Sequence, residues 1–170
     1  MPAMTPMQRR AALAALGLGA AGFGAWWWQA QALPLAPAVR FTLLDGSTHD
    51  SVAAWRNKVV LVNFWATSCA TCVKEMPDIV STHRRFAGRS FDTLAVAMQY
   101  DPPDYVVQFA QTRQLPFGVA IDNTGAIANA FGPVRMTPTT ILIDRRGQIV
   151  KRILGEPQFA QLHELIESLL

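Results

Sequence analysis

Residues 63–77 read NFWATSCATCVKEMP and contain the only two cysteines of the 170-residue chain, Cys69 and Cys72. An apolar run, Val59–Trp65, precedes the cysteines and predicts a buried strand, and the segment after them predicts a helix. A thiol at the N-terminus of a helix meets unpaired N–H groups and a partial positive charge, which stabilise the thiolate. The Cys-x-x-Cys spacing also brings the two sulfurs within reach of each other, so a disulfide can open and close without large backbone movement.

The cysteine pair has three interpretations. A structural zinc site needs about four ligands, and the available histidines, His49, His83 and His163, are scattered along the chain. A structural disulfide at this spacing closes a very small loop and removes little entropy from the unfolded chain. We therefore favour a redox-active dithiol with no metal and no further cofactor, in which Cys69 attacks and Cys72 resolves the mixed disulfide.

Residues 1–32 are predicted to be a signal or anchor segment. Arg9 and Arg10 precede residues 11–28, which are 18 uncharged residues rich in Ala, Leu and Gly. That length approaches the ~20 residues of a membrane-spanning helix, and three tryptophans at its end resemble an interfacial belt, which favours a retained inner-membrane anchor. The alternative is cleavage at Ala30–Ala32, which would leave a soluble protein. Both outcomes place the domain in the periplasm or another extracytoplasmic space, because the arginines should stay inside.

The net charge of +3 comes mostly from this N-terminal segment. Residues 1–32 contain two arginines and no acids, so 13 basic and 12 acidic residues remain in the rest of the chain. This balance, without a basic cluster that contains interleaved aromatics, gives no indication of nucleic acid binding.

The remainder of the chain predicts a short linker and one domain. Residues 33–38 hold two prolines and predict the linker, and residues 39–170 have the size of a single domain. Strand and helix patterns alternate and end in a hairpin and a terminal helix, which predicts an α/β fold with a mixed central sheet and helices on both faces. The expected strands are 39–44, 59–64, 91–97, 117–121, 139–144 and 148–154, and the expected helices are 70–86, 101–114, 126–131 and one beginning near 157.

Three local features are also predicted. Thr67 or Ser68 should cap the helix that carries the cysteines. Asp101 should cap the helix that follows it, with proline in the first turn. Pro138 directly precedes an apolar strand, where a trans proline has no obvious use, so we expect a cis peptide bond in a tight turn. An ordinary loop proline is the alternative.

Residues 63–77, together with the downstream Thr137–Thr140, resemble the thioredoxin superfamily and, within it, the exported TlpA/ResA-type thiol-disulfide oxidoreductases, which are often membrane-anchored. The resemblance implies a thioredoxin-like fold over residues 39–170, with an N-terminal strand extension and a helical insertion at Asp101–Gln114. It also implies that Pro138 is cis beside the cysteine pair, and that the preceding threonine offers backbone hydrogen bonds to an extended substrate, so Thr137 and Pro138 are predicted substrate-binding residues.

The chain departs from the family pattern at three places. Ser68 stands where tryptophan is usual, Ala70-Thr71 replaces a dipeptide that usually ends in proline, and Asn63 replaces the buried aspartate of thioredoxin. These changes bear on redox potential and substrate preference, because the dipeptide tunes thiolate stability. Glu75 is a candidate substitute acid–base group. The alternative, a solvated helix residue beside Lys74, is the interpretation that the sequence favours.

The resemblance implies a disulfide reductase of exported cysteine-containing proteins, apocytochrome c among them, that a membrane electron donor of DsbD or CcdA type re-reduces. Two alternatives remain. A peroxiredoxin-like thiol peroxidase would need Thr or Ser three residues before its reactive cysteine, where this chain has Ala66. A copper- or haem-handling chaperone on the same fold usually has a wider Cys-x-x-x-Cys spacing and a dedicated histidine.

Overall fold

The structure is a computed structural model, and it describes residues 33–170. The predicted signal or anchor segment, residues 1–32, lies outside the described residues, and the domain boundaries at residues 33 and 39 stay predictions. In the part that the structure describes, no helix combines the length and the apolar character that crossing a membrane requires.

A five-stranded mixed sheet forms the centre of the domain, with the strand order β5-β4-β3-β6-β7. Strands β4 and β5 run parallel to β3, whereas β6 runs antiparallel to β3 and β7 antiparallel to β6. This arrangement confirms the predicted mixed sheet. The strands are β3 (Val59–Trp65), β4 (Phe91–Ala97), β5 (Gly118–Ile121), β6 (Thr139–Ile143) and β7 (Ile149–Leu154).

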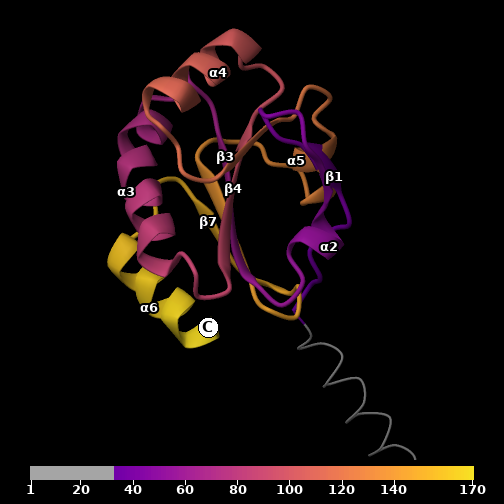
Figure 1. The fold of residues 1–170 in the computed structure, drawn as a ribbon, viewed down its shortest axis with the longest axis vertical. Helices are drawn as coiled ribbons and strands as arrows, with labels where there is room; N and C mark the ends of the chain where they lie inside the picture. The colour runs from indigo at the N-terminus through magenta and orange to yellow at the C-terminus, as the bar shows by residue number, and fades with distance from the viewer. Residues whose placement is uncertain (1–32) are drawn as a thin grey trace, which may run out of the picture. The chain divides into compact units, whose positions relative to one another are not determined.

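Helices cover both faces of the sheet, as predicted (Figure 1). On one face lie α3 (Ala70–Phe86) and α6 (Phe159–Leu169), and on the other lie α2 (Ser51–Ala54) and α5 (Ala126–Ala130). The helical insertion, α4 (Pro103–Thr112), connects β4 to β5. Parallel neighbours require a long crossover of this kind.

The central strand β3 is buried along its whole length. Val62 and Phe64 pack into the apolar cluster on the α5 side, whereas Leu61 and Trp65 pack into the cluster on the α3 side. Because side chains alternate between the faces of a strand and both faces are covered, every side chain of β3 is buried, and all of them except Asn63 are apolar. The continuous apolar run in the sequence has this cause.

The N-terminal extension differs in detail from the prediction. The expected strand 39–44 is shorter, and it pairs with a second strand that leads into α2; neither the second strand nor α2 was predicted. The turn between the strands has Gly46 at φ 85°, a left-handed conformation that favours glycine. With three residues per strand and four in α2, these elements are too short to show a hydrophobic period. The two strands are β1 (Arg40–Thr42) and β2 (Thr48–Asp50).

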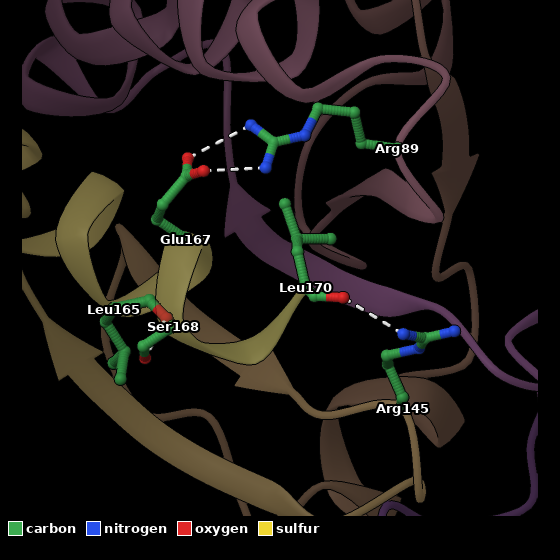
Figure 2. A network of polar contacts seen from close by, with 6 residues as sticks. All are labelled: Arg89, Arg145, Leu165, Glu167, Ser168 and Leu170. Carbon is green, nitrogen blue, oxygen red and sulfur yellow. Dashed lines mark hydrogen bonds and ion pairs between the residues drawn. The ribbon is translucent and has the colours of Figure 1, made fainter.

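The C-terminal helix α6 is held at its end by two arginines (Figure 2). Arg89 donates two hydrogen bonds to the Glu167 carboxylate, at 2.6 and 3.1 Å, and Arg145 donates one to the Leu170 carbonyl at 2.9 Å. Both members of the ion pair are about half exposed, at 48% and 50%, so water screens their attraction. The buried apolar stripe of α6, which includes Ile166, is therefore its main attachment to the sheet.

The burial of β3 predicts the effect of truncating one of its side chains. Leu61 is fully buried, so Leu61→Ala should lower the free energy of unfolding by about 2–5 kcal/mol through lost apolar burial and the cavity that remains. Urea denaturation of the oxidised protein measures this change. Val52→Ala, at a side chain 56% exposed, is the control and should change stability by no more than about 0.5 kcal/mol. Equal effects of the two substitutions would contradict the assignment of β3 as the core strand.

Candidate active site

The two cysteines lie at the start of α3 and form a disulfide with an S–S distance of 2.14 Å. Cys69 is the N-cap residue of α3, and its Sγ accepts a hydrogen bond from the Cys72 backbone N–H at 3.1 Å. The predicted cap by Thr67 or Ser68 is therefore wrong, because the sulfur itself occupies the capping position. Cys69 is partly exposed and Cys72 is fully buried, so only the first sulfur is open to a partner from outside.

The loop before Cys69 is fixed by a buried carboxylate. Asp101, only 2% exposed, accepts hydrogen bonds from the Thr67 backbone N–H at 2.7 Å and from Thr67 Oγ1 at 2.5 Å. The predicted cap by Asp101 is wrong, because α4 begins with Pro102 as its N-cap and has no side-chain cap. Strands β3 and β4 end side by side, with Met98 N–H bonded to the Trp65 carbonyl, and this pairing brings Asp101 to the loop. No local pattern in the sequence could reveal a contact between residues that are so far apart.

The peptide bond between Thr137 and Pro138 is cis, which confirms the prediction and excludes the ordinary trans loop proline. The register Phe64↔Thr139 between β3 and β6 places this bond next to the end of β3, where the loop to Cys69 departs. The Pro138 carbonyl accepts a hydrogen bond from the Gly155 N–H. Within residues 33–170, the backbone N–H and C=O of Thr137 form no hydrogen bond, so both are available to an added strand.

Glu75 is fully buried on the face of α3 that also carries Cys72, one helical turn earlier. The interpretation as a solvated helix residue is therefore wrong. Lys74 instead points outward, 72% exposed, and pairs with Glu156 at 3.0 Å. Two signals in the sequence could have indicated the burial of Glu75: its spacing of three from Cys72, and the apolar Met76 beside it.

Asn63 is the hydrogen-bond partner of this buried acid. Its Nδ2 donates to Glu75 Oε1 at 3.0 Å and to Thr140 Oγ1 at 3.1 Å, while Glu75 Oε2 has no hydrogen-bond partner within residues 33–170. Burial raises the pKa of Glu75 to about 7, because an apolar environment disfavours the carboxylate. The hydrogen bond from Asn63 acts in the opposite direction and stabilises the ionised form. Near neutral pH, Glu75 can therefore both accept and release a proton.

The histidines do not approach the cysteines to form a metal site in the described part of the chain. Each of His49, His83 and His163 hydrogen-bonds a nearby hydroxyl side chain. Among residues 33–170, no three His, Cys, Asp or Glu side chains are grouped so that they could hold a metal ion.

Comparisons with known proteins agree with this geometry. The Redoxin family model matches residues 31–166. The thiol-disulfide oxidoreductase ResA of Bacillus thuringiensis subsp. konkukian (strain 97-27) is 32% identical over 135 residues, which cover 79% of this chain and 76% of that protein. ResA of Geobacillus thermodenitrificans (strain NG80-2) is 33% identical over 134 residues, which cover 79% and 75% of the two chains.

Solved structures show the same likeness. A thiol:disulfide interchange protein of the thioredoxin family from Chlorobium tepidum TLS superposes with a TM-score of 0.74 at 26% identity, covering 81% of this chain and 97% of that one. A candidate thioredoxin from Neisseria meningitidis is 40% identical, with a TM-score of 0.73 and coverage of 78% and 87%. With the family match, the ResA relatives and the dithiol at the start of α3, the chain belongs to the Redoxin family and is a thioredoxin-fold thiol-disulfide oxidoreductase of the TlpA/ResA type.

Proposed function

We propose that this oxidoreductase reduces the disulfides of exported proteins by exchange at Cys69 and Cys72. The supporting observation is the asymmetry of the pair, in which a partly exposed sulfur caps α3 and a buried sulfur lies behind it. The Cys69 thiolate attacks one sulfur of the substrate disulfide, and the other sulfur leaves as a thiolate. Cys72 then attacks Cys69 Sγ and releases the second substrate thiol. Two electrons pass to the substrate, and the enzyme is left as the Cys69–Cys72 disulfide.

The helix terminus supports the role of Cys69 as the nucleophile. The Cys72 N–H points at Cys69 Sγ, and the partial positive charge of the 17-residue helix α3 favours the thiolate at that position. Both effects lower the pKa of a cysteine relative to a free thiol.

Thr137 and Pro138 supply the docking edge for the substrate. The unpaired N–H and C=O of Thr137 match the hydrogen-bonding pattern of an extended peptide, which would add to the loop as a short strand. We assign these two residues to substrate binding, because they lie next to the end of β3 and thus near the loop that leads to Cys69.

Glu75 is the proposed acid–base group for Cys72. The Cys72 thiol is fully buried and must lose a proton before it attacks, and water has little access to it. Glu75 shares its face of α3, has an unpartnered oxygen, and has its pKa raised by burial to about 7, so it can take that proton near neutral pH. This role replaces the buried aspartate of thioredoxin with a carboxylate from another element.

The cellular setting rests on the N-terminal pattern and on the resemblance. Residues 1–32 support an extracytoplasmic domain, either anchored to the inner membrane or released by cleavage. Each cycle leaves the enzyme oxidised, so a two-electron donor must re-reduce it, and a membrane carrier of DsbD or CcdA type fits this place. Apocytochrome c and other exported cysteine-containing proteins are the proposed substrates.

Substitution of each cysteine tests the division of roles. Cys69→Ser should abolish the reduction of insulin disulfides, because the accessible nucleophile is lost. Cys72→Ser should instead accumulate a mixed disulfide between Cys69 and the substrate, because the resolving thiol is missing. Insulin turbidity and mass spectrometry of the trapped adduct measure the two effects, with circular dichroism as the control for folding. An insulin reduction rate that is unchanged in Cys69→Ser would rule out the proposed function.

The equilibrium redox potential tests the direction of electron flow. A reductase supplied from the membrane should have a potential near that of thioredoxin, around −270 mV. The fraction of the Cys69–Cys72 disulfide in a series of glutathione or dithiothreitol buffers gives this value. A potential near that of the oxidant DsbA, about −120 mV, would instead make the protein an oxidase of exported thiols.

The pKa of Glu75 predicts a pH dependence of stability. Between pH 4.5 and about 7, folded Glu75 keeps a proton that the unfolded chain has lost, so its contribution to stability falls as the pH rises. Glu75→Gln cannot titrate. The free energy of unfolding of the wild type minus that of Glu75→Gln should therefore decrease by about 3 kcal/mol between pH 4 and pH 8. Urea titrations of both oxidised proteins across this range measure the difference, and a flat difference would contradict the raised pKa.

A kinetic measurement separates the acid–base role of Glu75 from a purely structural one. The rate at which Cys72 resolves a preformed Cys69 mixed disulfide should rise with pH through about 7 in the wild type, as Glu75 ionises. In Glu75→Gln this inflection should disappear. An inflection that persists unchanged in the variant would leave Glu75 without a role in proton transfer.

A further inference from the structure

A groove runs along α4, directly beside the loop that carries Cys69. Thr67 and Ser68 form one wall of the groove, and Tyr100 lies at the junction between β4 and α4. The groove has a volume of about 620 Å³, which falls in the range of ligand-binding clefts. The side chains of the opposite wall lie on one face of α4 and its C-terminal end: Tyr105, Gln108, Phe109, Thr112 and Arg113.

The groove continues between α4 and α3. A second hollow shares Phe109 and Arg113 with the first, and its other wall is formed by α3. The side chains that α3 contributes are mostly apolar, and they include Val73 and Met76, just beyond the cysteines, and Arg84 further along. The two hollows, which meet at Phe109 and Arg113, together line a path from the active-site loop to α3.

The free charges along this path are positive. Arg84 and Arg113 are exposed, and neither forms an ion pair with a carboxylate within residues 33–170. The guanidinium of Arg113 lies over the ring of Phe109, 5.6 Å from its centroid. Asp101, the one acid that lines the groove, turns its carboxylate to Thr67 instead.

The mouth of the groove connects to the docking edge for the substrate. Tyr100 hydroxyl lies 3.2 Å from Thr137 Oγ1, so the cis-proline loop and the groove meet at this tyrosine. On the wall formed by the active-site loop, Ser68 is small and exposed where the family usually has tryptophan, and it leaves the entrance open. A peptide that pairs with Thr137 and presents its cysteine to Cys69 has a path for its flanking residues into the groove.

We propose that this groove binds the polypeptide that flanks the reacting cysteine of the substrate, and that it selects acidic and apolar side chains. Substrate carboxylates pair with Arg113 and Arg84, because their guanidinium groups match a carboxylate in geometry and charge. Apolar side chains pack against Phe109 and the apolar residues of α3. The inference rests on the proposed function and adds the substrate class: extended, acidic segments of unfolded exported proteins.

Charge-matched peptides test the selectivity. Two peptides carry one cysteine as a mixed disulfide with 2-mercaptoethanol, flanked on both sides by Glu-Leu in one and by Lys-Leu in the other. The reduced full chain in neutral detergent should react with the glutamate peptide about three to ten times faster at low salt, and the difference should shrink at 0.5 M salt. A third peptide with Glu-Ser flanks should react more slowly than the Glu-Leu peptide. Quenched-flow mass spectrometry gives the second-order rate constants.

Substitutions locate the selectivity in the groove. Arg113→Glu should reverse the order of the glutamate and lysine peptides. Arg56→Glu is the control, because it makes the same change in net charge. Arg56 lies just before the start of β3, whereas Cys69 follows the other end of that strand, so this variant should keep the wild-type order of the two peptides. Equal rates of the two peptides in the wild type, or the same reversal in Arg56→Glu, would overturn the groove proposal alone. If the reduced chain reacts with neither peptide and also fails to reduce hydroxyethyl disulfide, the proposed function falls and takes the groove proposal with it.

Discussion

The burial of β3 on both faces is the constraint on which the rest of the structure depends. This strand pairs with β4 on one side and β6 on the other, and its side chains enter both apolar clusters. Its C-terminal end therefore fixes three segments at once: the loop to Cys69, the β4 end that carries Asp101, and the β6 start after Pro138. The active site is the place where these three chain segments leave the sheet together.

The same enclosure makes the polar residues of the site costly. A buried polar atom without a partner typically costs about 1–3 kcal/mol, and in the part of the chain that the structure describes both Glu75 Oε2 and Asn63 Oδ1 are without one. Protonation lowers this cost for Glu75, since a neutral acid loses less on burial than a carboxylate, and the raised pKa expresses that preference. An apolar residue would pack at this position without the penalty. The proposed transfer of a proton from Cys72 to Glu75 gives a physical reason for a carboxyl group at this position.

The sequence predicted those features that depend on neighbours along the chain. The bounds of α3 and β4 agree with the prediction, because helix and strand patterns arise from residues that are close together in the chain. The mixed sheet and the cis bond at Pro138 followed in the same way. The errors at Asp101 and Glu75 have a different cause: each carboxylate is engaged by a partner from another strand or loop. Local patterns can indicate helix caps and solvated helix faces, but the positions of Asp101 and Glu75 depend on contacts with residues far away in the chain.

In our proposal, thiol exchange and substrate selectivity belong to different elements of the fold. The dithiol lies at the start of α3, near the end of β3 and the cis-proline loop, and the core fixes the positions of all three. Helix α4 forms the crossover between the parallel strands β4 and β5, and its buried Val106 attaches its inner face to the apolar core. Its outer face, with Tyr105 and Arg113, carries no such packing demand. Charges along the groove can therefore change the preferred substrate without disturbing the dithiol, the cis bond or the buried acid beneath them.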